Sequence, residues 1–228
     1  MLVEPPPSRW LIPSPRRTDA EGLVGIGADL EPGTLLAAYR VGAFPMPVDG
    51  LLAWFSPDPR TVIPLARPTG GTGSRTLRRA RRKFDIRVDT AFERVVAACG
   101  DPRRPGGWIT PEMTEAYAAL HRLGWAHSVE SWTPDEQLGG GLFGVAVGGL
   151  FAAESMFHVV TDGSKAAVVG LIEILEDEPD AARRVLDVQW SSAHLATLGA
   201  IEVRRADYLR SVEQATALPQ PAAFTTGT

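Results

Sequence analysis

One segment in the middle of the chain, residues 127–155, constrains the fold more than any other. It consists of three extended and largely apolar runs, His127–Trp132, Gly139–Val147 and Leu150–Ser155. Two short turn sequences, Thr133–Glu136 and Gly148–Gly149, separate these runs. Because turns of this length reverse the direction of a strand, the sequence predicts a three-stranded antiparallel meander.

Helical segments surround this meander. We expect helices over residues 31–40, 74–83, 90–99, 111–123, 164–176 and 191–198, and further strands over 51–55, 61–65, 84–88 and 185–189, before a last strand and helix. In the helix that ends at Cys99, Thr90 and Glu93 have the spacing of a capping box, which predicts that this pair closes the first turn. Helices interleaved with hairpins are typical of an α+β fold rather than of a doubly wound parallel sheet.

Proline and glycine mark the organisation of the N-terminal part. Five prolines fall within residues 1–15, which excludes a helix, a central strand or the apolar run of a signal peptide there. A second cluster of proline and glycine covers residues 67–73 and interrupts the pattern of strands and helices. We therefore expect a small N-terminal domain over residues 1–70 and a larger domain over residues 71–228.

The charge balance and the single cysteine limit the possible functions. The net charge of −4 argues against a protein whose whole surface binds nucleic acid. Cys99 is the only cysteine, which excludes a disulfide framework and a multi-cysteine zinc site, and its apolar neighbours indicate a buried, inert thiol. The four histidines lack paired-ligand spacing, and every apolar run is shorter than the ~20 residues that span a bilayer. We expect a cytoplasmic protein with no metal, no cofactor and no membrane contact.

Positive charge is concentrated in one segment. Between Arg75 and Arg87 there are seven basic residues and one acidic residue, so this segment carries +6 and the rest of the chain carries −10. On a helix, the arginines at positions 75, 78, 79 and 82 share one face, which suits a phosphate backbone because guanidinium groups bind phosphate oxygens in pairs. The alternative is a solvated face in a chain whose basic residues are nearly all arginine.

Polar residues interrupt two otherwise apolar strands. In residues 185–189, a period of two places Asp187 and Gln189 on one face, where a carboxylate can hold a cation or orient an amine and an amide can position a second polar group. Glu154 closes the meander beside apolar residues, and a buried carboxylate needs a partner or a substrate. Exposure at a sheet edge is the alternative for each acid.

Trp108 stands in a glycine-flanked loop, where a base or another ring could stack on it, although core packing is the commoner use of tryptophan. The sequence has no P-loop, no dinucleotide-binding glycine motif after a strand and no nucleophile elbow. These absences disfavour most nucleotide-dependent enzymes and serine hydrolases.

Taken together, a series of motifs resembles the leucyl/phenylalanyl-tRNA–protein transferases, bacterial enzymes of the N-end rule pathway. The similarity runs in order from about Gly22 to Tyr208. The matching stretches are Leu23–Leu30, Gly42–Pro45, Trp54–Arg60, Trp108–Thr110, Glu115–Tyr117, Leu123–Glu130, Gly140–Ala146, Glu154–Phe157, Ser164–Lys165, Asp187–Gln189, His194–Ala200 and Arg204–Tyr208. Each motif is weak alone, but so many in the same order are very specific.

The resemblance implies a fold and a reaction. Family members have a small N-terminal domain and a larger acetyltransferase-like domain, here with a mixed, mainly antiparallel sheet. They transfer leucine, phenylalanine or sometimes methionine from tRNA to the α-amino group of proteins that begin with arginine or lysine, which marks those proteins for degradation. Because the aminoacyl ester is already activated, the enzyme chiefly places a neutral amine next to the carbonyl. The resemblance implies leucyl-tRNA, phenylalanyl-tRNA and basic N-termini as partners, with no cofactor, and a monomer is sufficient.

The resemblance also implies roles for individual residues. Gln189 would orient the attacking amine, Asp187 would polarise or anchor it, and Glu154 would help hold the cationic N-terminus. The pocket for the transferred side chain maps onto Leu142, Phe151, Ala153, Met156, Val168, Leu171, Leu175 and Leu186. The terminal adenosine of the tRNA would stack near Trp108, and Tyr39, Met46 and Ser192 complete the substrate-binding set. The residues expected to contact tRNA are Arg75, Arg78, Arg79, Arg82 and Lys83.

Two positions depart from the family pattern. Met46 stands where the family has a tryptophan, which replaces one aromatic platform for the adenosine with a thioether. Ser192 stands where the family has an asparagine, three residues after the glutamine. Both departures fall in the substrate-binding set, so they could change substrate preference.

Two other functions compete with this interpretation. An acyl-coenzyme A N-acetyltransferase would share the fold, but the glycine motif that binds pyrophosphate between a strand and a helix is missing after Ser155. A non-catalytic module that binds tRNA or basic N-termini is the other alternative. The presence of Asp187, Gln189 and Glu154 argues against such a module.

Overall fold

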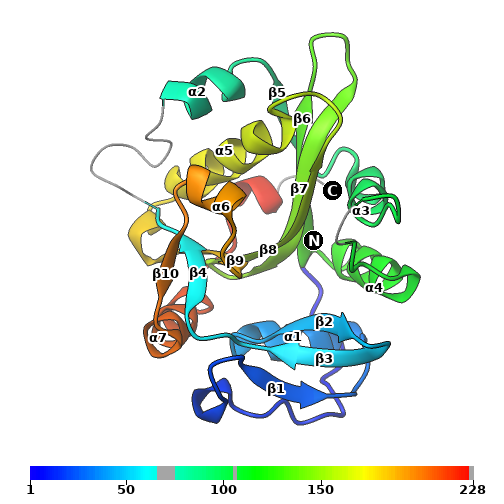
Figure 1. Cartoon of the computed structure of the whole chain (residues 1–228), viewed down its shortest axis with the longest axis vertical. Helices are drawn as coiled ribbons and strands as arrows, with labels where there is room; N and C mark the ends of the chain where they lie inside the picture. The colour runs from blue at the N-terminus through cyan, green and yellow to red at the C-terminus, as the bar shows by residue number, and fades with distance from the viewer. Residues whose placement is uncertain (66–74, 105–106, 226–228) are drawn as a thin grey trace.

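The structure is a computed structural model that describes residues 1–65, 75–104 and 107–225, and it contains two sheets (Figure 1). The smaller sheet has the strand order β1-β3-β2, and the larger one has the order β10-β4-β9-β8-β7-β6-β5. The small sheet comprises β1 (Leu23–Ile26), β2 (Phe44–Val48) and β3 (Leu51–Phe55), with helix α1 (Pro32–Arg40) beside it. The predicted α+β class is confirmed.

The large sheet is mixed and mainly antiparallel, as predicted. Its strands are β4 (Arg60–Ile63), β5 (Asp85–Val88), β6 (Ala126–Trp132), β7 (Leu138–Val147), β8 (Leu150–His158), β9 (Val185–Gln189) and β10 (Ile201–Val203). Only β8 and β9 pair in parallel among these described strands. The predicted meander is β6, β7 and β8.

Helices cover both faces of the large sheet (Figure 1). They are α2 (Arg75–Arg81), α3 (Phe92–Cys99), α4 (Pro111–Arg122), α5 (Gly163–Glu176), α6 (Ala193–Thr197) and α7 (Arg205–Ala215). Strand β7 shows the period of two that this arrangement requires, because Phe143 packs in the cluster with α3 and α4 whereas Leu142 packs in the cluster with α5. The sheet therefore separates two apolar cores, and the candidate site opens into the one on the α5 side.

Two strands of the small sheet are additions to the predicted set. The sequence FPMPV of β2 carries Pro45 and Pro47, which disfavour a strand when read locally. Because β2 lies at the edge of its sheet, only alternate residues need to direct an N–H group toward β3, so both prolines are tolerated. The predicted domain boundary near residue 70 lies outside the described residues; sheet membership changes earlier, between the end of β3 and Arg60 at the start of β4.

The predicted capping box is wrong. Helix α3 begins at Phe92, and its N-cap residue, Ala91, makes no side-chain cap. The Thr90 hydroxyl instead donates to the carboxylate of Glu130 on β6, at 2.7 Å, and the Ala91 N–H donates to the same carboxylate at 3.3 Å. Glu130 is fully buried and also accepts a 2.5 Å hydrogen bond from the Ser128 hydroxyl. A strand 40 residues away therefore supplies the cap that local spacing assigned to Glu93.

We predict that Glu130→Ala lowers the free energy of unfolding by about 3 kcal/mol, because several buried donors lose their acceptor at once. Glu93→Ala, at the exposed position of the predicted box, should change it by less than about 0.5 kcal/mol. Urea unfolding of both variants measures the difference. Equal losses in the two variants would contradict the assignment of the cap to Glu130.

Candidate active site

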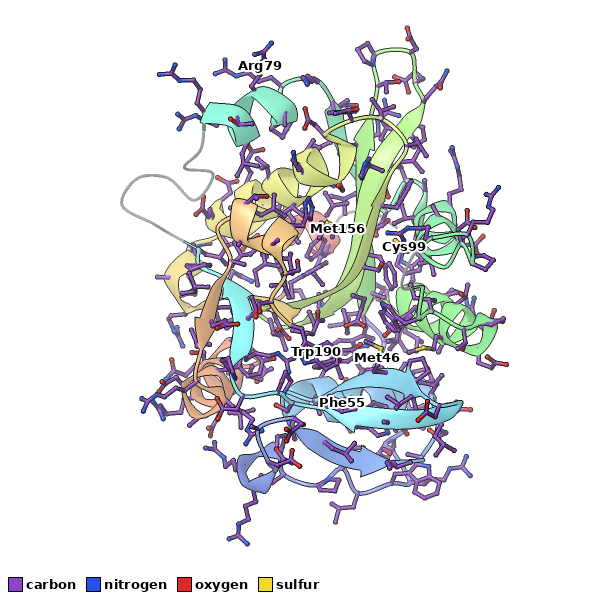
Figure 2. All side chains as sticks on the ribbon, in the orientation of Figure 1. Met46, Phe55, Arg79, Cys99, Met156 and Trp190 are labelled. Carbon is purple, nitrogen blue, oxygen red and sulfur yellow. The ribbon has the colours of Figure 1, made fainter. Side chains whose placement is uncertain are left out.

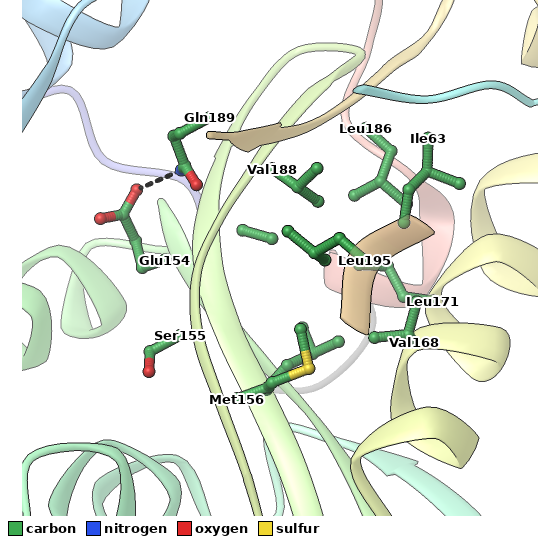
Figure 3. Close-up of a pocket in the computed structure, with 12 residues that line it drawn as sticks. Ile63, Glu154, Ser155, Met156, Val168, Leu171, Leu186, Val188, Gln189 and Leu195 are labelled. Atoms are coloured by element: carbon green, nitrogen blue, oxygen red, sulfur yellow. Dashed lines mark hydrogen bonds between the residues drawn. The ribbon is translucent and has the colours of Figure 1, made fainter. Parts of the chain in front are cut away.

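A small pocket opens between β8, β9, α5 and α6 (Figure 3). Its volume is about 90 Å³. The lining residues are Ile63, Leu142, Ala153, Glu154, Ser155, Met156, Val168, Leu171, Leu186, Val188, Gln189 and Leu195. Figure 3 shows Glu154, Ser155 and Gln189 on one side and the apolar side chains of Ile63, Leu171 and Val168 on the other. The pocket can therefore hold an apolar group while polar groups face one end of it.

The backbone opens this pocket through two irregularities. In the described chain, β8 and β9 pair as far as Ala152 and Asp187. The register between β7 and β8 shifts next to Glu154, since Phe143 pairs with Ser155 and Gly144 pairs with Ala153. Glu154 is thus the extra residue of a β-bulge, and a bulge turns a side chain away from the direction that alternation gives it. Gln189 has a positive φ of 60° at the end of β9, which likewise redirects its side chain.

Glu154 lies at the centre of a buried hydrogen-bond chain. Its carboxylate accepts from the Tyr117 hydroxyl at 2.7 Å and from the Gln189 amide nitrogen at 3.2 Å. The Tyr117 hydroxyl is also 3.1 Å from the hydroxyl of Tyr39. Burial raises the pKa of Glu154 to about 7, against the lowering effect of the tyrosine hydrogen bonds. Near neutral pH this carboxyl group is therefore able to take up and release a proton.

Asp187 lies outside the pocket lining, although it is two residues from Gln189. It is fully buried and forms a bidentate ion pair with Arg60, at 2.8 Å to Nε and 2.5 Å to Nη2. The Tyr208 hydroxyl donates to Asp187 at 2.9 Å, and the backbone N–H of Gln189 donates to it at 3.0 Å. We expected alternation along the strand to give Asp187 and Gln189 a common face. The positive φ of Gln189 breaks it, and so does a register shift against β4, in which Val188 of β9 is the extra residue.

Six of the eight residues expected in the apolar pocket line it: Leu142, Ala153, Met156, Val168, Leu171 and Leu186. Phe151 and Leu175 do not line it and are buried in the surrounding apolar cluster. Phe151 lies where β8 and β9 are still paired, and Leu175 lies one turn beyond Leu171 on α5. The prediction missed Ile63, Ser155, Val188 and Leu195. Of these, Ile63 and Val188 occur in apolar runs that predicted strands, but nothing local indicated which face would be hollow.

The remaining expected substrate-binding residues lie around this pocket or apart from it. Trp108 is half-buried against the cluster of α3 and α4, and Tyr39 is buried and bonded to Tyr117. Met46 is half-buried on β2 of the small sheet, two residues after Phe44 (Figure 2). Ser192 is exposed, and its hydroxyl caps helix α6 by accepting from the Leu195 N–H at 3.1 Å. None of these four residues lines the pocket itself.

Trp190, which sequence reasoning did not single out, joins the two sheets. Its ring packs edge-on against Phe44, with centroids 4.7 Å apart, and lies 5.7 Å from Phe55. It follows Gln189 directly, so the end of β9 is held against the small sheet. Figure 2 shows Trp190 and Phe55 at this junction.

The expected arginine face is present on α2, which ends at Arg81, and on the two residues that follow it. Leu77 and Ala80 are buried, whereas the side chains of Arg75, Arg78, Arg79, Arg82 and Lys83 are exposed. Figure 2 shows Arg79 projecting away from the protein. In the described part of the chain, Lys83 pairs with Asp162 but none of these four arginines forms an ion pair. Helix α2 lies beside α5, which contributes Val168 and Leu171 to the pocket (Figure 1).

Two other groups have structural partners. Cys99 is buried, and burial raises the pKa of its thiol to about 11, so it is a poor nucleophile. Asp89, His121 and His127 place ligand-type atoms within 4.8 Å of one another. There, His127 bonds through Nδ1 to Asp89 at 2.7 Å and through Nε2 to the Gly124 carbonyl at 3.1 Å.

No helix within the described ranges has the length and apolar character to cross a membrane.

Comparisons with known proteins agree on one family. A family model described as leucyl/phenylalanyl-tRNA protein transferase matches residues 66–213, and a model of the N-terminal domain of such transferases matches residues 28–58. A leucyl/phenylalanyl-tRNA–protein transferase of Azoarcus sp. (strain BH72) is 45% identical over 92% of this chain and 89% of its own length. Those of Aromatoleum aromaticum and Magnetococcus marinus are 49% and 43% identical, over 83% and 92% of this chain and 79% and 90% of their own lengths.

We predict that Glu154 makes stability fall as the pH rises. Its folded pKa of about 7 lies above the ordinary 4.5, so the folded protein keeps a proton that the unfolded chain releases earlier. The stabilisation is complete below about pH 4.5 and is lost as the pH rises through 7. Between pH 5 and pH 8, the free energy of unfolding should fall by about 2 kcal/mol more in the wild type than in Glu154→Gln. Urea unfolding at both pH values tests this, and parallel behaviour of the two proteins would refute it.

Proposed function

Because the chain belongs to the leucyl/phenylalanyl-tRNA–protein transferase family, we propose that it joins leucine or phenylalanine, and methionine as a further donor residue, to proteins that begin with arginine or lysine. It is an aminoacyltransferase that uses aminoacyl-tRNA as donor and a protein as acceptor. The proposal adds the basic N-terminus of the acceptor, the degradation of the product, and action as a cytoplasmic monomer. The relatives' shared name gives no support to an acetyl-coenzyme A reaction.

The observation that carries this proposal is the apolar pocket that ends at Gln189 and Glu154. The pocket fits the side chain of the transferred residue, and its polar end fits the place where the ester and the amine meet. A γ-branched or unbranched side chain can enter such a pocket, whereas a β-branched one places its bulk at the entrance. The two polar groups are already hydrogen-bonded to each other, so the site is preorganised.

In the proposed reaction, the α-amine of the acceptor attacks the ester carbonyl carbon. The amide nitrogen of Gln189 donates to Glu154, which leaves the carbonyl oxygen of Gln189 to accept a hydrogen bond from the amine. Glu154, with a pKa of about 7, takes the proton that the amine loses as the new C–N bond forms. The ester C–O bond then breaks, and the ribose oxygen of the tRNA leaves with that proton.

Asp187 acts in this proposal as a positioning residue. Its carboxylate is occupied by Arg60 and Tyr208, and it reaches Gln189 through the backbone N–H. Because Gln189 has a positive φ, this contact helps to hold a conformation that glutamine rarely adopts. Asp187 thereby anchors the residue that orients the amine.

The exposed arginines of α2 fit the donor tRNA. Four guanidinium groups that lack ion pairs within the described chain lie on α2 and on Arg82, the residue that follows it, beside the pocket helix α5. Phosphate groups would pair with these arginines and release counterions, which makes binding strong at low salt. The proposal therefore places the tRNA backbone over α2 and its aminoacyl end in the pocket.

We predict that purified protein moves labelled leucine and phenylalanine from tRNA to peptides that begin with arginine or lysine, and not to peptides that begin with alanine. Gln189→Ala should lower kcat by about 100-fold or more, because the amine loses its orienting group. It should lower the free energy of unfolding by only about 1 kcal/mol, because Glu154 loses one of its hydrogen bonds. Glu154→Gln should remove the rise in kcat with pH near 7. Ribonuclease treatment of the donor is the control. Absence of label on every peptide would contradict the proposal.

The size of the pocket predicts a donor preference. A cavity of about 150 Å³ holds benzene, whereas this pocket has about 90 Å³. Leucine should therefore fit without rearrangement, and phenylalanine should require Met156 to move. We expect Met156→Ala to raise the kcat/KM for phenylalanyl-tRNA relative to leucyl-tRNA by about tenfold. Leu175→Ala, a buried change outside the pocket lining, should leave this ratio unchanged, and a shift in both variants would refute the size argument.

A further inference from the structure

A second groove adjoins the pocket. Its volume is about 400 Å³, and it lies between β4, β10 and the chain that leads into α6. Thr61, Ser191, Ser192 and Glu202 are among its lining residues. Leu195 lines both the pocket and the groove. The pocket and the groove therefore meet at Leu195.

Three residues form a row across neighbouring strands and connect the two sites. Gln189 on β9 pairs with Thr61 on β4, and Thr61 pairs with Glu202 on β10. Adjacent strands are about 4.8 Å apart, so the backbones of Gln189 and Glu202 are separated by about 10 Å. Thr61 and Glu202 lie directly opposite each other in a regular antiparallel pair, so their side chains point to the same face, and both line the groove. The row therefore leads from the amine site to a carboxylate.

Two members of this row, Thr61 and Glu202, lack partners within the described residues. The Thr61 hydroxyl is buried, with the residue 2% exposed, and has no hydrogen bond. Glu202 is exposed, and within the described residues its carboxylate makes no ion pair and no hydrogen bond. A buried hydroxyl without a partner is costly in a folded protein, and it is satisfied when a ligand supplies the missing donor or acceptor.

We infer that this groove binds the basic side chain of the acceptor's first residue, with Glu202 as the counter-charge and Thr61 as a hydrogen-bond partner. The inference rests on the proposed function and names how that site selects its acceptor. With the α-amine at Gln189, a long side chain runs along the row past Leu195, and its guanidinium or ammonium group reaches Glu202. Arginine and lysine have the length and the charge that this path requires, whereas alanine has neither.

The test compares peptides that begin with arginine and with citrulline, which has the same shape but no charge. With the wild type and leucyl-tRNA, we expect kcat/KM to be about tenfold higher for the arginine peptide. Glu202→Gln should reduce this ratio to about twofold, with the KM for leucyl-tRNA unchanged. Thr61→Val, which keeps the shape of the side chain, should raise the KM for the arginine peptide by a few fold. Glu93→Gln, an exposed carboxylate on α3, is the matched control and should keep the wild-type ratio.

The outcomes separate this inference from the proposed function. Absence of transfer to the arginine peptide in the wild type would overturn the proposed function. Transfer that does not distinguish arginine from citrulline, or a ratio that stays the same in Glu202→Gln, would overturn the groove assignment and leave the proposed function standing. Glu202 lies exposed on an edge strand, so we expect its substitution to leave the fold intact. The thermal unfolding temperature of each variant checks this.

Discussion

The buried ion pair between Arg60 and Asp187 is the interaction on which the rest of the site depends. Both side chains are almost fully buried, and the pair joins β4 to β9 in the large sheet. The guanidinium group also donates to the Gly42 carbonyl at 3.3 Å and lies between the rings of Phe44 and Tyr208, so it ties the small sheet and α7 to the same point. Removing one member of a buried pair leaves an uncompensated charge, which costs about 3–5 kcal/mol. Loss of activity on changing Asp187 would therefore combine a loss of stability with a loss of the Gln189 conformation, whereas a change of the Gln189 side chain leaves the buried ion pair in place.

The two polar groups at the mouth of the pocket are placed by departures from regular strand structure. Glu154 is the extra residue of a bulge, and Gln189 has a positive φ next to a register shift. In regular strands, the side chains of Glu154 and Ala153 would point to opposite faces, yet both line the pocket. The bulge therefore brings a carboxylate to an apolar wall, and the same burial raises its pKa toward 7. Position and proton affinity have one structural cause, which explains how a site with few polar groups can still accept a proton.

The sequence predicted those parts of the fold that local periodicity determines. The meander, the helix over residues 111–123 and the exposed arginines of α2 follow from patterns that repeat within a few residues. It did not predict contacts that depend on distant partners. Glu130 caps α3 from strand β6. Arg60 pairs with Asp187, which is 127 residues away in the sequence, and Tyr117 donates a hydrogen bond to Glu154, which is 37 residues away. Asp187, Gln189 and Glu154 could be singled out because polar residues in apolar strands are unusual. Their division into an anchor and two groups that line the pocket could not, since it depends on a bulge and on one backbone angle.

The distribution of charge is consistent with the proposed pair of substrates, a tRNA and a cationic N-terminus, which have opposite charge. The segment from Arg75 to Arg87 carries +6, and the rest of the chain carries −10. A tRNA is attracted to the first region, but a cationic N-terminus is repelled by it and needs a path on another side. In Figure 1, α5 and α6 lie between α2 and β10, so the arginine face and the groove with Glu202 are separated by the helices that cover the pocket. In the proposed arrangement the donor approaches over α2 and the acceptor approaches along β10. The two substrates then meet only at Gln189 and Glu154. The tRNA phosphates pair with the arginines and the basic side chain pairs with Glu202, so the two substrates do not have to neutralise each other.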